Sequence, residues 1–423
     1  MTAFFVVFIM LLLIGVPISI SIGAGAVVGC LWLDYPLMVI GQKMVSGIDS
    51  FLLIAIPLFV LAGNLMNAGK ITEKIFNFAK ELVGWIPGGL GHANVVASVI
   101  FAGMSGSAAA DAGGLGTIEM EAMTTNGYDK EFSAGVTAAS SVIGPVFPPS
   151  IPLIIYGSIA GVSVSQLFMG GVVPGLVMGL ALMVLVFIMA LRRGYPRTSF
   201  HILALIKQFF ASILSIITPL IILSGFTLGW FTPTEASSVA VGYALLIAIV
   251  VYRSMNWQSF KKCLLESALT SANTLFIIGS STLFSYVLIR EGVSARIAEF
   301  ILGISANPNI CLLVINALLL VLGMFMEPGA ILTLMLPVLI PIAKGLGLDM
   351  VHFGVLIVLN LMIGQVTPPF GVCLFIVGDV AKLELNKLYR SILPFLVPLI
   401  IVLFLITYVP EVVTWLPYRL IAK

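Results

Sequence analysis

Two short segments of the chain place a glycine and a pair of prolines inside long apolar stretches. Residues 144–149 read Gly-Pro-Val-Phe-Pro-Pro, and residues 364–369 read Gly-Gln-Val-Thr-Pro-Pro. Proline lacks the backbone N–H that would continue a helix, so each segment breaks its helix and leaves carbonyl oxygens without helical partners. Such carbonyls suit a hard, weakly hydrated cation such as sodium, while the N-terminus of the following half-helix favours an anion.

Polar groups at or beside these breaks are the candidate ligands for a cation or a substrate. Carbonyl oxygens are expected to be freed at Ser141, Gly144, Val146 and Thr367. The side chains concerned are Ser140, Ser141, Asn360, Gln365 and Thr367. The alternatives are that these side chains form interhelical hydrogen bonds and that the prolines merely kink packed helices.

A carboxylate precedes each break in the sequence. Residues 103–111 read Gly-Met-Ser-Gly-Ser-Ala-Ala-Ala-Asp and end on Asp111, whereas Glu327 stands before Pro-Gly in the second half. Carboxylates within a membrane are costly and usually functional, so both are candidates to tune sodium or proton coupling. Either could instead pair with a nearby backbone N–H. Glu119 and Glu121 lie nearer the next loop, and we expect them at the membrane interface.

The elements that position these residues are membrane helices. Only 9% of the 423 residues are charged and 60% are apolar, and the mean hydropathy is +1.18. A soluble domain has roughly 25% charged residues, and a spanning helix needs about 20 mostly apolar ones. Spans are predicted at 3–20, 23–40, 51–67, 132–158, 167–191, 212–229, 237–252 and 266–289, with an amphipathic stretch at 70–81 and a helical hairpin at 94–123.

The pattern repeats at one fixed shift along the chain. The shift that places Gly103 on Gly323 also places Asp129 on Asp349. The same shift places the first Gly and Pro-Pro break on the second. The frequent use of glycine and proline in membrane helices explains single matches but not a constant register. We therefore predict a duplicated unit of hairpin, loop and broken helix.

Basic clusters predict the orientation of the two units. Lysine and arginine mark cytoplasmic loops, and such residues gather at 192–207, 253–262 and 382–390. Placing these three segments inside sends the first broken helix outward and the second inward, with both termini outside. The two repeats are therefore expected to be inverted, as in secondary transporters.

Other functional classes find little support in the sequence. The four cysteines and three histidines are dispersed, and no P-loop or dinucleotide motif occurs, so we expect no transition metal, no ATP drive and no enzyme. A channel would need like residues around an oligomer axis. An intramembrane aspartyl protease remains an alternative, because Tyr128-Asp129 resembles half of that dyad and Asp349 lies one shift away.

The motifs together resemble a known family. They are Ile-Pro-Leu-Phe at 56–59 with Gly-Lys-Ile at 69–71, the hairpin at 105–111, Gly-Trp-Phe-Thr-Pro-Thr-Glu-Ala at 229–236, and the two breaks. Over essentially its whole length the chain resembles the large membrane subunit of tripartite ATP-independent periplasmic (TRAP) transporters. The resemblance implies a small four-helix membrane subunit, a periplasmic binding protein and a sodium gradient as driving force.

The resemblance also implies a fold and a division of the chain. The expected fold is an all-α polytopic membrane protein, with inverted repeats that each contain a re-entrant hairpin and a broken helix. Hairpins and broken helices would form a transport domain that moves like an elevator against a scaffold, as in the ion-transporter superfamily. The expected parts are a scaffold at 1–90, a first repeat at 91–165, further scaffold at 166–308, a second repeat at 309–385 and a C-terminal transmembrane helix at 386–423.

Sodium would bind where each hairpin tip meets its break. The implied ligands are Ser105, Gly106, Ser107, Ser141, Gly144, Val146 and Pro149 at the first site, and Glu327, Gly364, Thr367 and Pro369 at the second. Asp111, Ser140, Asn360 and Gln365 are the candidates for substrate binding or coupling. Substrates of the family are small carboxylates such as sialic acid and C4-dicarboxylates, and the expected location is the bacterial inner membrane.

Overall fold

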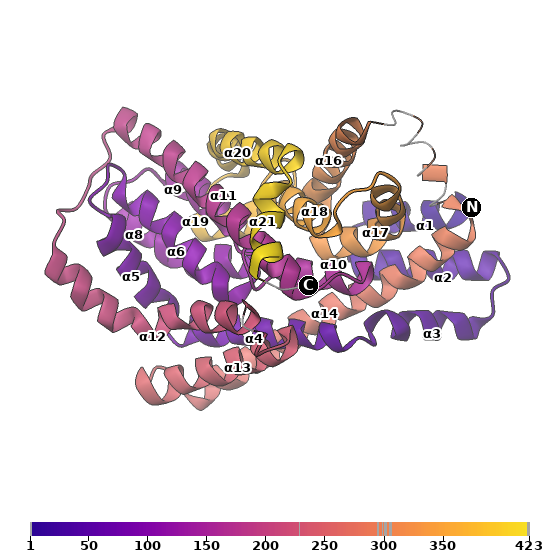
Figure 1. Cartoon of the computed structure of the whole chain (residues 1–423), viewed down its shortest axis with the longest axis horizontal. Coiled ribbons are helices and arrows are strands. Elements are labelled where there is room, and N and C mark those ends of the chain that lie inside the picture. Colours follow the sequence, from indigo (N-terminus) through magenta and orange to yellow (C-terminus); the bar gives the residue numbers. More distant parts are fainter. Residues whose placement is uncertain are drawn as a thin grey trace.

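The computed structural model describes residues 2–227, 229–293, 296–297, 299, 303 and 307–420. Within these ranges every regular element is a helix (Figure 1). Eight of the described helices are long and apolar enough to cross a membrane. The predicted all-α polytopic class is confirmed.

The N-terminal segment differs from the prediction. In place of spans at 3–20 and 23–40, it forms three shorter helices, α1 (Thr2–Leu13), α2 (Ile18–Trp32) and α3 (Leu37–Ile48). Pro17 and Pro36 each stand directly before a helix, where a missing N–H costs nothing, so they restart the chain in a new direction. The predicted spans ran through both of these prolines. α1 packs on α2, and both α2 and α3 pack on a long helix, α14 (Trp257–Arg290).

The predicted span at 51–67 and the amphipathic stretch at 70–81 are both present. A short 3₁₀ turn, η1 (Phe51–Ile54), leads into α4 (Ala55–Ala68), and α5 (Ile71–Val83) follows. α5 buries Ile71, Ile75 and Ala79, which recur every four residues on one face of the helix. α5 packs on α6 (Gly89–Ser105) and also contacts α12 (Ile202–Thr227).

The first repeat contains the predicted hairpin and broken helix. The hairpin enters through α6, turns at Gly106 and Ser107, and returns through α7 (Ala108–Ala110), a π-helical turn η2 (Asp111–Leu115) and α8 (Gly116–Thr125). The broken helix consists of α9 (Lys130–Ser141) and α10 (Ile151–Ala160). The residues between α9 and α10 include the whole Gly and Pro-Pro segment.

The second repeat reproduces the first with nearly the same boundaries. Its hairpin is α16 (Pro308–Phe325) and α17 (Pro328–Gly345), and its broken helix is α18 (Met350–Gly364) and α19 (Val372–Ala381). The shift that relates Gly103 to Gly323 carries the start of α9 at Lys130 onto the start of α18 at Met350. It also carries the end of α8 onto the end of α17. The duplication is confirmed.

The packing of the repeats shows how they are related. In each repeat the first limb of the hairpin packs on the first half of its own broken helix, α6 on α9 and α16 on α18. The returning limbs reach both repeats: α17 packs on α18 and on α10, while η2 and α8 pack on α9 and on α19. Reciprocal contacts of this kind between the repeats are what a two-fold relation between inverted repeats produces.

The remaining helices connect and flank the repeats. They are α11 (Val164–Arg193), α12, α13 (Pro233–Leu246) with a π-helical turn η3 (Ile247–Val251), α14, α20 (Leu385–Tyr408) and α21 (Glu411–Leu420). They contain the predicted spans at 167–191, 237–252 and 266–289 to within one residue. The span at 212–229 lies largely in α12, and residue 228 of it is outside the described residues. α21, which packs on α11, was not predicted as a separate helix.

Candidate functional site

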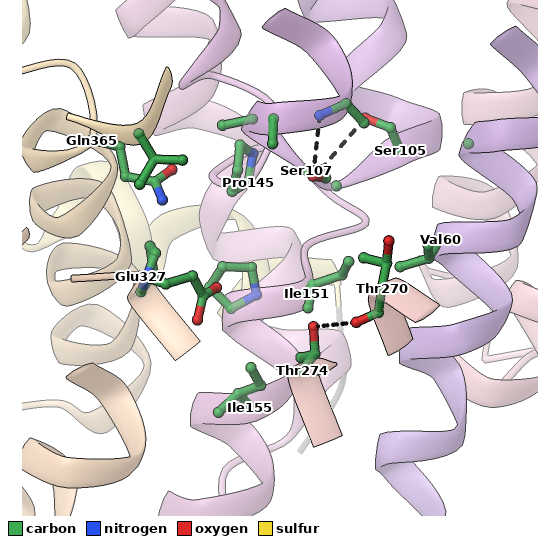
Figure 2. A pocket seen from close by; sticks show the side chains of 18 of the residues that line it. Val60, Ser105, Ser107, Pro145, Ile151, Ile155, Thr270, Thr274, Glu327 and Gln365 are labelled. Atoms are coloured by element: carbon green, nitrogen blue, oxygen red, sulfur yellow. Dashed lines mark hydrogen bonds between the residues drawn. The ribbon is translucent and has the colours of Figure 1, made fainter. Parts of the chain in front are cut away.

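A central cavity of about 400 Å³ lies where both hairpin tips and both breaks meet α4 and α14. Figure 2 shows Glu327 and Gln365 on one side of this cavity and Ser105 and Ser107 on the other, with Thr270 of α14 nearby. The two repeats therefore build one shared space rather than two separate ones. Its polar lining comprises Asn64, Ser105, Ser107, Thr270, Asn273, Thr274, Glu327 and Gln365.

The first hairpin tip lies directly against the first break. Gly106 has a φ of +59°, and a Cβ atom at this position would lie 2.5 Å from the carbonyl oxygen of Pro149. A Cβ on Gly144 would lie 3.8 Å from the carbonyl oxygen of Ser107. Glycine at 106 is therefore required both by the turn and by this close approach. The predicted meeting of tip and break is present.

The hydroxyl groups at this first contact already have local partners. The Ser107 hydroxyl accepts a hydrogen bond from the N–H of Ala110 at 3.3 Å and so caps the returning limb. Ser105 Oγ accepts from the N–H of Ser107 at 3.5 Å, and Ser141 donates to the carbonyl of Ala138 at 2.9 Å. Each hydroxyl oxygen has two lone pairs, so these bonds leave acceptor capacity for a cation.

Two predicted residues of the first break lie against neighbouring helices. The carbonyl oxygen of Val146 would be 2.1 Å from a Cβ on Gly171, so it faces the backbone of α11. Ser140 donates to Asn94 Oδ1 at 2.7 Å. Asn94 in turn donates to Thr137 at 2.7 Å, which links α6 to α9. Ser140 thus forms an interhelical hydrogen bond, which is the alternative to cation or substrate binding that the sequence also allowed.

The second hairpin tip carries a carboxylate into the cavity. Glu327 lines the cavity, and its Oε2 accepts a hydrogen bond from the N–H of Ala330 at 3.2 Å. Glu327 therefore caps the N-terminus of α17, where the helix dipole favours a negative charge. Of the two roles that the sequence allowed for Glu327, pairing with a backbone N–H is present, and the same carboxylate faces the cavity.

The second break differs in detail from the first. A Cβ on Gly364 would lie 2.7 Å from the backbone of Gly323, so the break rests on the first limb of its own hairpin. Thr367 donates to the carbonyl of Ile363 at 2.7 Å, and the carbonyl of Pro369 accepts from Tyr389. Gly364, Thr367 and Pro369 are not among the residues that line the central cavity. They lie next to it, beside Gln365.

Asn360 and Gln365 lie on α18 and just after it, with different surroundings. Asn360 donates to the carbonyl and the side-chain oxygen of Asn316, both at 3.0 Å, which ties α18 to α16. Its own Oδ1 is buried without a partner among the described residues. Gln365 lines the central cavity and is 7% exposed. Gln365 is thus the polar side chain that the second break presents to the cavity.

Asp111 and Glu119 form a buried pair of carboxyl groups on the returning limb of the first hairpin. Asp111 Oδ1 accepts from Ser98 at 3.4 Å, whereas its Oδ2 and both oxygens of Glu119 have no partner within the described structure. The expectation that Glu119 is interfacial is wrong, because it is 0% exposed. Residues eight apart differ by about 80° around a regular α-helix. The π-helical turn η2 adds one residue and so brings Glu119 round to the side of Asp111.

Part of the cavity lining was missed by the sequence reading. Thr270, Asn273 and Thr274 of α14 stand at i, i+3 and i+4, so they share one helix face, and Asn64 of α4 joins them. The signal was available, because these amide and hydroxyl side chains interrupt an apolar helix at helical spacing. Length and hydropathy alone, which predict the span at 266–289, do not distinguish this face of the helix from the others.

Asp129 and Asp349, the pair weighed for proteolysis, have separate partners. Asp129 contacts Arg193 at 3.0 Å and accepts from the Tyr195 hydroxyl at 2.6 Å. Burial is the largest cause that raises the pKa of Tyr195, and the hydrogen bond to Asp129 is the second. The pKa is about 12, so the phenol stays protonated and acts as the donor. Asp349 caps α18 by accepting from the N–H of His352 at 2.9 Å. The two carboxylates share no hydrogen-bond or ion-pair partner in the described structure.

The inverted repeats, the paired broken helices and the shared central cavity define the class of secondary transporters. The family model described as "Tripartite ATP-independent periplasmic transporter, DctM component" matches residues 5–412. The chain belongs to this family of TRAP transporter large membrane subunits, as the sequence motifs indicated. It is a multi-pass membrane protein of the TRAP transporter family.

Similar proteins carry related names. The chain is 47% identical over 379 residues to the sialic acid TRAP transporter large permease protein SiaM of Vibrio cholerae, covering 89% of this chain and 88% of that protein. It is 36% identical over 439 residues to the C4-dicarboxylate TRAP transporter large permease protein DctM of the same species, covering 98% and 96%. These relatives are named as permeases and not as enzymes.

A solved structure shows the same fold. The YdaH transporter of Alcanivorax borkumensis, described as having an unusual topology, aligns with a TM-score of 0.60 at 14% identity. The alignment covers 88% of both chains. At this identity the likeness concerns the fold alone.

Proposed function

We propose that the chain carries out sodium-coupled uptake of a small organic anion. The observation that carries this proposal is the charge of the central cavity. Among the described residues that line it, Glu327 is charged and none is lysine, arginine or histidine. An anion entering this space therefore finds a like charge and no cationic side chain. Sodium ions at the two hairpin tips would supply the missing positive charge, so anion binding would depend on prior sodium binding.

The proposed sodium sites use the oxygens gathered at each tip. At the first site these are the hydroxyls of Ser105, Ser107 and Ser141 with the carbonyls around Gly144 and Pro149. At the second site Glu327 would contribute the carboxylate, and carbonyl oxygens of the second break would complete the set of ligands. Oxygen ligands alone suit a hard cation. Asp111 has a side-chain oxygen, Oδ2, that is buried without a partner in the described structure. Its carboxyl group would interact electrostatically with a sodium ion bound at the first site.

The proposed motion is an elevator. The hairpins and broken helices pack on one another through the reciprocal contacts described above, whereas α4 and α14 complete the lining of the cavity. The first group would move as one body and carry anion and sodium past the second. Polar Asn64, Thr270 and Asn273 would face the anion from the static side.

Substrate, partners and location follow from the relatives' names and the family. We propose a small carboxylate, with sialic acid and a C4-dicarboxylate as the first to test, because similar proteins are named for both. A periplasmic binding protein would deliver it, and a small four-helix subunit would complete the membrane unit. The proposed location is the bacterial inner membrane, with the basic segments at 192–207, 253–262 and 382–390 on the cytoplasmic side.

Sodium binding is testable without transport. A ligand that binds the native state alone stabilises it, and each tenfold rise in concentration above the dissociation constant adds about 1.4 kcal/mol per bound ion. We expect increasing concentrations of sodium chloride to raise the thermal unfolding temperature of the purified protein progressively. Potassium chloride at equal ionic strength should give a lower unfolding temperature than sodium chloride. Equal stabilisation by the two salts would remove the selective sodium sites from the account.

A further inference from the structure

A second cavity, separate from the central one, lies at one end of the helix bundle. This basic pocket has a volume of about 230 Å³ and is formed by the start of α9, the end of α11 and the start of α20. Arg193, Lys387 and Arg390 contribute three positive charges to its lining, and Glu131 contributes one negative charge. The proposed transport function makes no use of this pocket.

The positive charges of the basic pocket are only partly balanced. Arg193 contacts Asp129 at 3.0 Å, and Lys387 approaches Glu384 at 4.0 Å with 57% of its side chain exposed. Exposed pairs at such a distance are weak. Arg390 has no hydrogen-bond or ion-pair partner anywhere in the described structure. The side chains that line the pocket therefore carry three positive charges and one negative charge, and Arg390 is the cation that an anionic ligand would pair with.

The surroundings of the basic pocket are those of a membrane boundary. Both α11 and α20 are apolar enough to span a membrane, and the pocket lies at their charged ends. Phe132 and Pro394 give it an apolar wall. Farther along α20, on a neighbouring face of that helix, Val397 and Ile401 are exposed apolar side chains. A ligand here meets cations at one end and lipid-facing hydrocarbon at the other.

We propose that the basic pocket binds the phosphate headgroup of an anionic phospholipid, whose acyl chains lie along α20. Guanidinium groups bind phosphate oxygens through charge-assisted, bidentate hydrogen bonds, and Arg193 and Arg390 provide two such groups. Basic pockets between membrane helices are a general solution for anionic headgroups. A free phosphate ion would use the charges but not the adjoining apolar surface, which favours the lipid as occupant.

Lipid titration tests the proposal. The purified protein, in nanodiscs of phosphatidylcholine, is titrated with phosphatidylglycerol, and bound lipid is counted by native mass spectrometry. We expect the double variant Lys387→Gln/Arg390→Gln to bind phosphatidylglycerol about 30-fold more weakly than the unmodified chain. Each basic residue near the membrane surface contributes about 1 kcal/mol to anionic lipid binding, and the loss of two corresponds to about this factor. Arg192→Gln is the matched control, because Arg192 is exposed beside Arg193 and does not line the pocket.

Two results would overturn the proposal. The first is equal phosphatidylglycerol affinity of the double variant and Arg192→Gln. The second is competition by inorganic phosphate at the same concentration as the lipid, which would assign the pocket to a free anion instead. The single variant Arg390→Gln replaces an exposed side chain without a partner, so we expect it to retain the fold. It therefore serves as the test if the double variant folds poorly, and it too is expected to bind phosphatidylglycerol more weakly.

Discussion

Gly106→Ala is expected to lower the apparent sodium affinity of the transporter at least tenfold. The added Cβ would lie 2.5 Å from the carbonyl oxygen of Pro149, whereas ordinary contact begins at 3.4 Å, so the hairpin tip must withdraw from the break by about 1 Å. Metal-ligand distances tolerate shifts of about 0.2 Å. A withdrawn tip therefore removes Ser105 and Ser107 from any cation held at the break. Sodium titration of uptake, or of thermal stability, measures the effect.

The control for this variant separates backbone strain from disruption of the site. Gly106 has φ +59°, and a side chain in the left-handed region costs roughly 1–2 kcal/mol wherever it occurs. Gly127 and Gly161 have φ of +83° and +67°, and nothing lies within 4 Å of a Cβ at either position. Gly127→Ala and Gly161→Ala should therefore show the loss of stability without the loss of sodium affinity. If all three variants behave alike, contact between tip and break is not what binds sodium.

Glu327→Gln is expected to weaken sodium binding by about 10- to 100-fold. Glu327 supplies the negative charge of the central cavity and also caps α17 through Ala330. Glutamine keeps the size and an oxygen acceptor for that N–H, so the cap is largely retained. It loses the charge, and interactions with charged groups are worth about 1.5–3 kcal/mol. Steady-state uptake at varied sodium concentrations measures the shift.

The matched substitution for Glu327→Gln is on the other hairpin. Glu121 lies on the returning limb of the first hairpin, is exposed and does not line the central cavity. Glu121→Gln should leave the sodium dependence of uptake unchanged. A Glu327→Gln protein with the sodium affinity of the Glu121→Gln protein would show that the carboxylate serves only as a helix cap.

The hairpins and breaks could be predicted from the sequence because local chemistry determines them. Proline and glycine act on the backbone at their own positions, and one constant shift repeats the pattern in the second half. The boundaries agree closely, as at Lys130 and Met350 where α9 and α18 begin. The family and its fold were predicted in the same way, from motifs that are contiguous in the chain.

Features that depend on helix phase or on distant packing could not be predicted in this way. The burial of Glu119 depends on one extra residue in the turn at 111–115, which no local motif indicated. The orientation of the Val146 carbonyl toward Gly171 depends on how α11 packs across the break. Ser140 and Asn360 are hydrogen-bonded to asparagines that lie 46 and 44 residues away in the chain.

The central claim is that sodium drives uptake through the shared cavity. The most direct measurement is uptake of labelled sialic acid or a C4-dicarboxylate by proteoliposomes that contain this chain and its small subunit, with binding protein outside. We predict accumulation when an inward sodium gradient and the binding protein are both present, and none when potassium replaces sodium. Accumulation that is undiminished with potassium in place of sodium would contradict the account.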